Sequence, residues 1–239
     1  MVAKIEERQG GGRRWAMSKP SVLVFASGSA TGGGSGFEKL VLASRDGTLE
    51  ADIVAVVSNH ANGGVRTRAD KLGIPFLHFP KPWSAEAYQR FASESGAAFF
   101  ALSGWLKLVT GLDPATNFNS RTTFNIHPGP LPEFGGPGMY GHHVHEEVMA
   151  AYRRGEVECS AVSMHFVTEE YDHGPIFFQG KVKINEDDTP DTLGTRVIQA
   201  EHRFQPVITN MVVNDLIRWD GIDPNSLHVP SDYFIDCYT

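Results

Sequence analysis

Residues 124–132 read Phe124-Asn125-Ile126-His127-Pro128-Gly129-Pro130-Leu131-Pro132, and this stretch decides how the rest of the sequence is interpreted. In an extended strand, side chains two residues apart share a face, so Asn125 and His127 are expected to point the same way. Pro128 has no backbone N–H and disfavours helix before it, so the strand is expected to end at His127. An amide and an imidazole would then lie at the carboxyl end of a strand, where open α/β sheets place their ligands. Taken alone, the same two residues also suit a simple turn cap.

The sequence on both sides of this stretch alternates between apolar runs and helical patterns. Apolar runs predict strands, and apolar residues at helical spacing predict helices. The expected strands are 22–26, 53–57, 74–79, 97–103, 122–127, 160–167 and 176–184, and the expected helices are 37–43, 65–72, 85–95, 142–154 and 189–213. Alternating strands and helices indicate a parallel sheet with right-handed crossovers, and the last two strands are expected to pair antiparallel. The predicted fold class is therefore α/β: a Rossmann-like open sheet, mostly parallel with an antiparallel C-terminal portion, and helices on both faces.

Composition limits the classes of partner. The 239 residues are 41% hydrophobic and 21% charged, which are ordinary values for a soluble globular protein. A formal net charge of −7 argues against nucleic acid or an anionic membrane surface as a partner. No apolar run approaches the roughly 20 residues that span a bilayer. Cys159 and Cys237 match no metal-ligand or redox spacing, so we expect a cytoplasmic protein with reduced thiols.

The ends of the chain differ in character from its middle. Residues 1–20 are polar, contain Gly10-Gly11-Gly12, and are expected to form a flexible N-terminal extension, with Met17 as a second candidate start. Residues 21–214 are expected to form one domain, since no linker or repeat interrupts them. Residues 215–239 are expected to be a tail that packs on the domain or trails from it.

A glycine-rich loop follows the first expected strand. It runs from Gly28 to Gly36 and leads into the helix that begins near Phe37. A strand, a glycine loop and a helix start present free backbone N–H groups and a positive dipole end, which favour an anion. The loop matches neither the Walker pattern nor a clean dinucleotide fingerprint. We therefore predict phosphate binding here, with a flexible connector as the alternative.

Two further segments have more than one interpretation. Residues 104–109 (Gly-Trp-Leu-Lys-Leu-Val) suit either a flat aromatic ligand or a helical turn packed into the core. His142, His145 and Glu146 have a spacing compatible with a metal site on one helix face. Histidines in the first turns of a helix are more often surface or capping residues, so no metal is predicted.

The chemistry suggested by these residues is transfer of an acyl-type group. An amide donor can stabilise the oxyanion that forms when an amine attacks a carbonyl carbon. An imidazole can move the proton, and a carboxylate beside it raises its pKa. Asp172, in the acidic loop 168–175, is the candidate carboxylate. No Ser or Cys stands in a nucleophile elbow, which favours direct transfer without a covalent intermediate.

The motif Asn125-Ile126-His127-Pro128, together with Asp172-His173-Gly174-Pro175 downstream, resembles the folate-dependent formyltransferases. The similarity runs from Val22 to Val213, most of the chain. It implies transfer of a formyl group from 10-formyltetrahydrofolate, as co-substrate, to an amine. Chain length, acidic charge and Glu201-His202 favour the branch of this superfamily that acts on glycinamide ribotide (5′-phosphoribosylglycinamide) in purine biosynthesis.

The resemblance also implies roles for individual residues. By position, Asn125 holds the formyl oxygen, His127 is the general acid/base, and Asp172 raises the pKa of His127. The residues expected to bind the acceptor substrate are Gly34, Ser35, Gly36 and Glu201. Those expected to bind the folate are Leu102, Leu106, Lys107, Leu108, Val109, Asn125, Thr168, Glu169, Glu170, Tyr171 and Asp172. The expected partners are small-molecule substrates, with no metal, and the chain is expected to be a monomer or a homodimer.

Three departures from the family pattern concern the substrates. The family's glycine loop is usually shorter and ends Gly-Ser-Asn, whereas here Gly36 stands in place of the Asn. Ala85 lies near the usual position of an arginine that faces the folate tail, and Ile198 stands where a glutamine is common. A backbone phosphate site survives the change at Gly36, but a side-chain contact does not.

Other functions of related proteins are the alternatives. A formyltetrahydrofolate hydrolase usually carries an extra N-terminal regulatory domain, for which residues 1–20 are too short. Formyltransferases that act on amino sugars or initiator tRNA usually append a C-terminal domain, for which the tail is too short. A non-catalytic nucleotide or folate binder would tolerate loss of Asn125, His127 or Asp172, yet all three are present.

Overall fold

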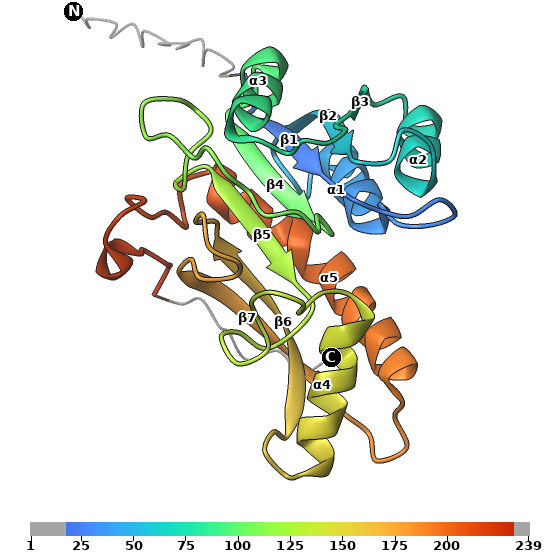
Figure 1. Ribbon diagram of the computed structural model, residues 1–239. Coiled ribbons are helices and arrows are strands. Elements are labelled where there is room, and N and C mark those ends of the chain that lie inside the picture. Colours follow the sequence, from blue (N-terminus) through green and yellow to red (C-terminus); the bar gives the residue numbers. More distant parts are fainter. Residues whose placement is uncertain (1–17, 232–239) are drawn as a thin grey trace, which may run out of the picture.

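The computed structural model describes residues 18–231. Most of the expected extension at 1–20 and the last part of the expected tail at 215–239 lie outside these residues. The described residues form a seven-stranded sheet of order β3-β2-β1-β4-β5-β6-β7 (Figure 1). Its strands are β1 (Ser21–Phe25), β2 (Asp52–Ser58), β3 (Phe76–His78), β4 (Phe99–Ser103), β5 (Thr123–His127), β6 (Cys159–Phe166) and β7 (Ile176–Lys183).

The strand directions confirm the predicted fold class. The neighbours among β1 to β5 pair parallel, while β6 runs antiparallel to β5 and β7 antiparallel to β6. The strand β5 ends at His127, as Pro128 predicts. The expected strand 74–79 is shorter than predicted, because the Ile74 N–H bonds to the Ala69 carbonyl and so belongs to the end of the preceding helix.

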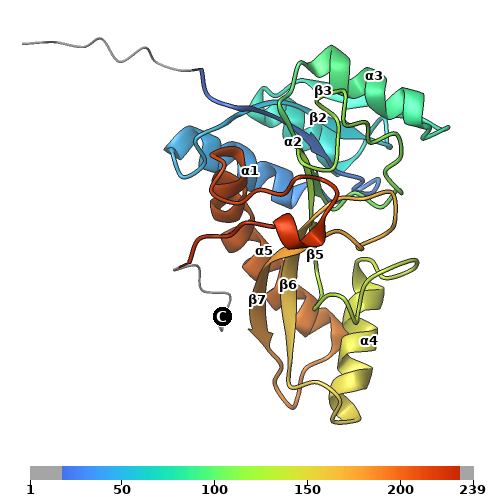
Figure 2. The same ribbon diagram turned by 90° about the vertical axis from the view of Figure 1, so that its left-hand side faces the viewer.

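Helices connect the strands where the periodicity predicts them. They are α1 (Ser35–Asp46), α2 (Gly64–Leu72), α3 (Ala85–Ser95), α4 (His142–Arg153) and α5 (Pro190–Val213), with a 3₁₀ turn η1 (Pro224–Ser226) in the tail. The helix α5 begins at a capping box in which Thr189 and Thr192 bond to each other's backbone N–H. It is the longest of these helices and runs along the sheet beside β6 and β7 (Figure 2).

Around β1, β2 and β4 both faces of the sheet are covered, which explains why these strands are mostly apolar rather than alternating, whereas β6 and β7 contribute to one core cluster only. Along β1, Val22 and Val24 join the core cluster to which α1, α2, α4 and α5 contribute, while Leu23 and Phe25 join the cluster under α3. The tail returns to the first cluster, because Trp219 is buried with its ring 5.9 Å from that of Phe166. None of the helices in residues 18–231 is long and apolar enough to cross a bilayer.

Candidate active site

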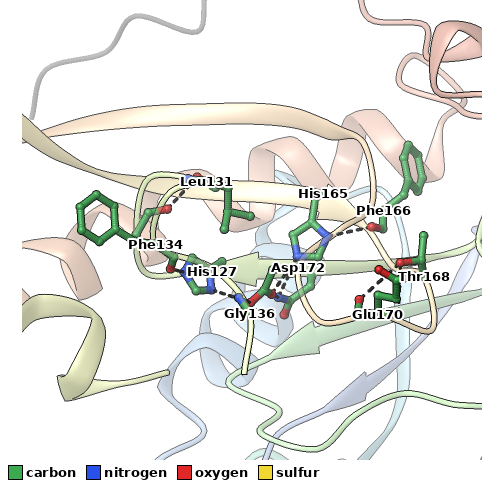
Figure 3. A network of polar contacts seen from close by, with 12 residues as sticks. His127, Leu131, Phe134, Gly136, His165, Phe166, Thr168, Glu170 and Asp172 are labelled. Carbon is green, nitrogen blue, oxygen red and sulfur yellow. Dashed lines mark hydrogen bonds and ion pairs between the residues drawn. The ribbon is translucent and has the colours of Figure 1, made fainter. Parts of the chain in front are cut away.

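The two residues singled out in β5 meet one carboxylate at the end of the strand. Asn125 Nδ2 lies 3.5 Å from Asp172 Oδ1, and His127 Nδ1 lies 3.7 Å from Asp172 Oδ2. Asp172 comes from the loop between β6 and β7. It lies 45 residues after His127 in the sequence, so the contact joins distant segments of the chain. Figure 3 shows Asp172 between the rings of His127 and His165. The structure therefore brings the three predicted catalytic residues together.

His127 is held from its far side by a backbone carbonyl. Its Nε2–H donates to the Phe134 carbonyl at 2.7 Å, and the side chain is almost fully buried. With the proton on Nε2, the Nδ1 lone pair faces Asp172. Burial lowers the pKa of His127 and outweighs Asp172 and the Phe134 carbonyl, which raise it. Asp172 does raise the pKa of His127, as expected, but the effect of burial is larger. The net pKa is therefore lowered, and the imidazole is neutral near pH 7.

Asp172 is fixed in its ionised form. Its Oδ2 accepts a hydrogen bond from the Gly136 N–H at 3.0 Å, and its Oδ1 lies 3.4 Å from His165 Nε2. Burial raises the pKa of Asp172, but the Gly136 N–H, together with His165 and His127 when their rings are protonated, lowers it further, so the net pKa lies below its ordinary value. Its backbone has φ of +57°, a conformation that Asp tolerates better than most residues.

His165 is a residue of this cluster that the sequence interpretation did not assign to the site. It lies opposite Asn125 in the antiparallel pair β5–β6, and its Nε2 accepts from Asn125 Nδ2 at 3.1 Å. Its Nδ1 donates to the Phe166 carbonyl at 2.8 Å, which fixes the tautomer needed for that contact. His165 therefore orients the Asn125 amide.

A cavity of about 720 Å³ opens beside this cluster. Its lining includes Asn125, His127 and Asp172, three glycines of the loop before α1 (Gly28, Gly33 and Gly34), and Glu201 on α5. Gly34 is the N-cap residue of α1 with no side-chain cap, so the first N–H groups of the helix are available for an anion. All four residues expected to bind the acceptor, Gly34, Ser35, Gly36 and Glu201, therefore line the same cavity as the catalytic cluster.

Glu201 has an unusual electrostatic environment for a carboxyl group. Burial raises its pKa to about 8, so it is mostly protonated at pH 7 in the free protein. A neutral carboxyl group both donates and accepts a hydrogen bond, which suits contact with hydroxyl or amine groups.

The residues expected to bind the folate divide into three groups. A second cavity of about 40 Å³ has most of them in its lining: Leu102, Lys107, Leu108, Val109, Asn125, Thr168, Glu170, Tyr171 and Asp172. Leu106 instead lines the larger cavity. Glu169 lines neither, because its Oε1 accepts from the Gly111 and Leu112 N–H groups at 2.7 and 3.3 Å.

Residues 104–109 had two interpretations, a surface for a flat ligand or a helical turn packed into the core, and the structure supports part of each. Trp105 and Val109 are buried in the core, and the Trp105 Nε1–H donates to the Tyr88 hydroxyl at 2.8 Å. Of the three residues between them, Lys107 and Leu108 line the small cavity, which Trp105 and Val109 also border, and Leu106 lines the large one. No helix forms here, so the segment both packs into the core and borders the site.

The histidines of α4 do not assemble a metal site. Residues 18–231 contain no group of three or more His, Cys, Asp or Glu placed to hold a metal ion. His142 and His143 are exposed and pair with Glu146, whereas His145 is buried against Gly194 of α5. His145 Nδ1 has no hydrogen-bond partner among the described residues.

This buried histidine predicts a pH dependence of stability. Burial lowers the pKa of His145 from 6.5 to about 4, so below pH 6.5 the unfolded chain binds a proton that the folded protein does not. We expect this residue to reduce the free energy of unfolding by about 2 kcal/mol between pH 7 and pH 5. Urea unfolding of wild type and His145→Asn at both pH values measures the difference. An equal loss in both proteins would contradict the assignment.

Comparison with known proteins identifies the family. The sequence profile described as formyl transferase matches residues 21–209. A phosphoribosylglycinamide formyltransferase, chloroplastic, from Arabidopsis thaliana is 34% identical over 228 residues, covering 87% of this chain and 76% of the relative. A phosphoribosylglycinamide formyltransferase from Bacillus subtilis (strain 168) is 30% identical over 196 residues, covering 80% of this chain and 93% of the relative.

The fold comparison agrees with the sequence comparison. The crystal structure of phosphoribosylglycinamide formyltransferase from Anaplasma phagocytophilum superposes with a TM-score of 0.75 at 26% identity, covering 92% of this chain and 99% of that one. The matched profile spans both β5 and the loop that carries Asp172. The matched residues include the cluster of Asn125, His127 and Asp172, and the chain therefore belongs to the formyl transferase family.

Proposed function

We propose that the protein transfers the formyl group of 10-formyltetrahydrofolate to the amine of 5′-phosphoribosylglycinamide, in purine biosynthesis. One observation carries this proposal: the Asn125, His127 and Asp172 cluster lines the same cavity as a glycine loop at a helix N-terminus. A substrate with an amine at one end and a phosphate at the other suits this cavity. Its amine would lie at the cluster and its phosphate at the glycine loop. The names of the Arabidopsis and Bacillus relatives support the same acceptor.

The reaction follows from the groups in the cluster. The acceptor amine attacks the formyl carbon and forms a C–N bond, and the carbonyl electrons move to the oxygen. Asn125 Nδ2 donates to that oxyanion. Its contact with Asp172 is 3.5 Å, at the limit for a hydrogen bond, so this N–H is available to a substrate while the other donates to His165.

The proton of the attacking amine leaves through His127 in this proposal. Because the resting imidazole is neutral with its lone pair on Nδ1, it accepts the proton there, through water, beside the Asp172 carboxylate. The C–N bond to the folate then breaks, the carbonyl re-forms, and the same proton passes to the leaving nitrogen. Asp172 stays ionised and stabilises the transient imidazolium.

The folate site changes shape in this proposal. A volume of about 40 Å³ accommodates only a few water molecules. A pterin ring is larger, so we infer that the walls formed by residues 107–109 and 168–172 separate when folate binds. Glu169 joins those walls through its bonds to the Gly111 and Leu112 N–H groups.

Glu169→Ala is expected to weaken folate binding. Loss of an exposed carboxylate that holds two N–H groups corresponds to a rise of about threefold to tenfold in the KM for 10-formyltetrahydrofolate. The KM for the acceptor is expected to stay constant, and Glu169→Gln, which keeps an accepting oxygen, is expected to lie between wild type and Ala. Steady-state kinetics with each substrate varied measures this, and an unchanged folate KM in Glu169→Ala would refute the role.

The proposed function is tested by following the folate product by absorbance with the ribotide present and then omitted. Product that forms only with the ribotide supports the transferase. Equal rates without it would instead support a formyltetrahydrofolate hydrolase, and no product with the ribotide would direct the search to another amine, such as an amino sugar.

We also propose a location for the protein in the cell. The proposed compartment is the cytoplasm, although the Arabidopsis relative is named as chloroplastic. A monomer or a homodimer stays the prediction for the assembly.

A further inference from the structure

Gln205 is a buried polar residue of the cavity that neither the sequence interpretation nor the proposed reaction uses. It lies on α5, one helical turn after Glu201, and only 1% of its surface is exposed. Its Oε1 accepts from the Ser103 hydroxyl at 3.0 Å. Its Nε2 has no hydrogen-bond partner among the described residues. A buried amide donor without a partner is unfavourable and rare, so this one is expected to serve a ligand.

The position of Gln205 relative to the glycine loop indicates which ligand. Gln205, Ser103 and Gly36 are all in the lining of the large cavity, together with Gly34 and Ser35 at the start of α1. A side chain at residue 36 would overlap the Ser103 hydroxyl, and its Cβ would lie 3.0 Å from Gln205 Oε1. Gly36 therefore leaves the space that the Gln205 amide and the Ser103 hydroxyl occupy.

The amino end of α1 supplies the complementary charge. Its N-cap residue Gly34 has no side-chain cap bond, so backbone N–H groups and the positive end of the helix dipole face the cavity. Gln205 lines the same cavity, and because its Oε1 is held by the Ser103 hydroxyl, its Nε2 is the unpaired end of a fixed amide. A tetrahedral anion at this end of the cavity would receive donors from both α1 and α5.

We propose that Gln205 is a binding residue for the phosphate of the acceptor, and that it supplies the side-chain amide donor that Gly36 cannot. This proposal rests on the proposed function for the identity of the acceptor. Ser103 is a positioning residue, since its hydroxyl holds Oε1 and so directs Nε2 to the ligand. The donor comes from α5 instead of the glycine loop.

Two substitutions at residue 205 separate the lost donor from the lost volume. Gln205→Met keeps the size without the donor and is expected to raise the acceptor KM about tenfold. Gln205→Glu keeps an oxygen for Ser103 but places a carboxylate near the phosphate, so a rise of about 100-fold is expected. The folate KM and kcat are expected to stay near wild type. Gln199→Met and Gln199→Glu, at an exposed residue of the same helix, are the matched controls.

A binding measurement makes the test independent of catalysis. Calorimetry with ribose 5-phosphate is expected to show binding to wild type that weakens about tenfold in Gln205→Met. Ser103→Ala, which leaves Gln205 in place, is expected to raise the acceptor KM about threefold and tests the proposal if the residue-205 variants unfold at lower temperature.

The outcomes distinguish this inference from the proposed function. If wild type formylates the ribotide but Gln205→Met and Ser103→Ala keep its KM and its affinity for ribose 5-phosphate, the role of Gln205 is wrong and the function stands. If ribose 5-phosphate binds in a Gln205-dependent manner but the ribotide is not formylated, the phosphate contact stands and the proposed acceptor is wrong.

Discussion

His127→Ala is expected to lower kcat by about a thousandfold, within the range of roughly 10²–10⁴ that a general acid–base contributes. The imidazole is the group in the cluster whose neutral form accepts a proton at Nδ1 beside Asp172. Both KM values are expected to change little, because the opposite ring nitrogen bonds to the Phe134 carbonyl of the protein itself. Steady-state kinetics with both substrates measures the effect.

The pH profile gives this prediction a second readout. Because burial lowers the pKa of His127, wild-type kcat is expected to fall as the pH drops through a value below 6.5, where the imidazole becomes protonated. His127→Ala is expected to lack this limb. His143→Ala, at an exposed histidine of α4, is the matched control and is expected to keep wild-type kinetics. Activity of His127→Ala near the wild-type rate would refute the proton path.

Asn125→Ala is expected to lower kcat by about 10²–10³, the effect of removing one oxyanion donor. The amide is oriented before substrate arrives, since His165 Nε2 accepts one of its N–H groups at 3.1 Å. Because this donor acts on charge that develops in the transition state, kcat is expected to fall more than either KM rises. The measurement is the ratio of kcat values with both substrates saturating.

Two variants control the interpretation of Asn125→Ala. Asn117→Ala, in an exposed loop, is expected to leave kcat unchanged. Asn125→Asp keeps the shape but places a second carboxylate beside Asp172, so it is expected to be at least as impaired as Ala. A kcat in Asn125→Ala within threefold of wild type would show that another group holds the oxyanion.

Local sequence rules were sufficient for much of the fold. Pro128 predicts the end of β5 at His127, because a proline both lacks the ladder donor and restricts the residue before it, and the structure confirms this end. The apolar runs 22–26 and 53–57 predict buried strands, which is confirmed because β1 and β2 contribute residues to both core clusters. The predicted catalytic trio also meets, although the contact with Asp172 depends on a loop whose path the sequence does not specify.

Two residues that were missed, His165 and Gln205, depend on pairings across the fold. His165 faces Asn125 only through the register of β5 and β6, and a shift of one residue would turn it to the other face. His145 could have been separated from its neighbours, since residues 144, 145, 148 and 149 of α4 form one buried face at helical spacing. Gln205 had no such local signal, because its partners Ser103 and Gly36 come from β4 and α1.

The central claim is direct transfer of a formyl group between two bound substrates. A single-turnover reaction with 10-formyltetrahydrofolate carrying an isotopic label in the formyl carbon tests it most directly. We predict that the label appears in N-formylated glycinamide ribotide at the rate at which the folate product forms, with no labelled formate and no labelled protein. Label released as formate at the same rate without ribotide, or held covalently on the chain, would contradict this account.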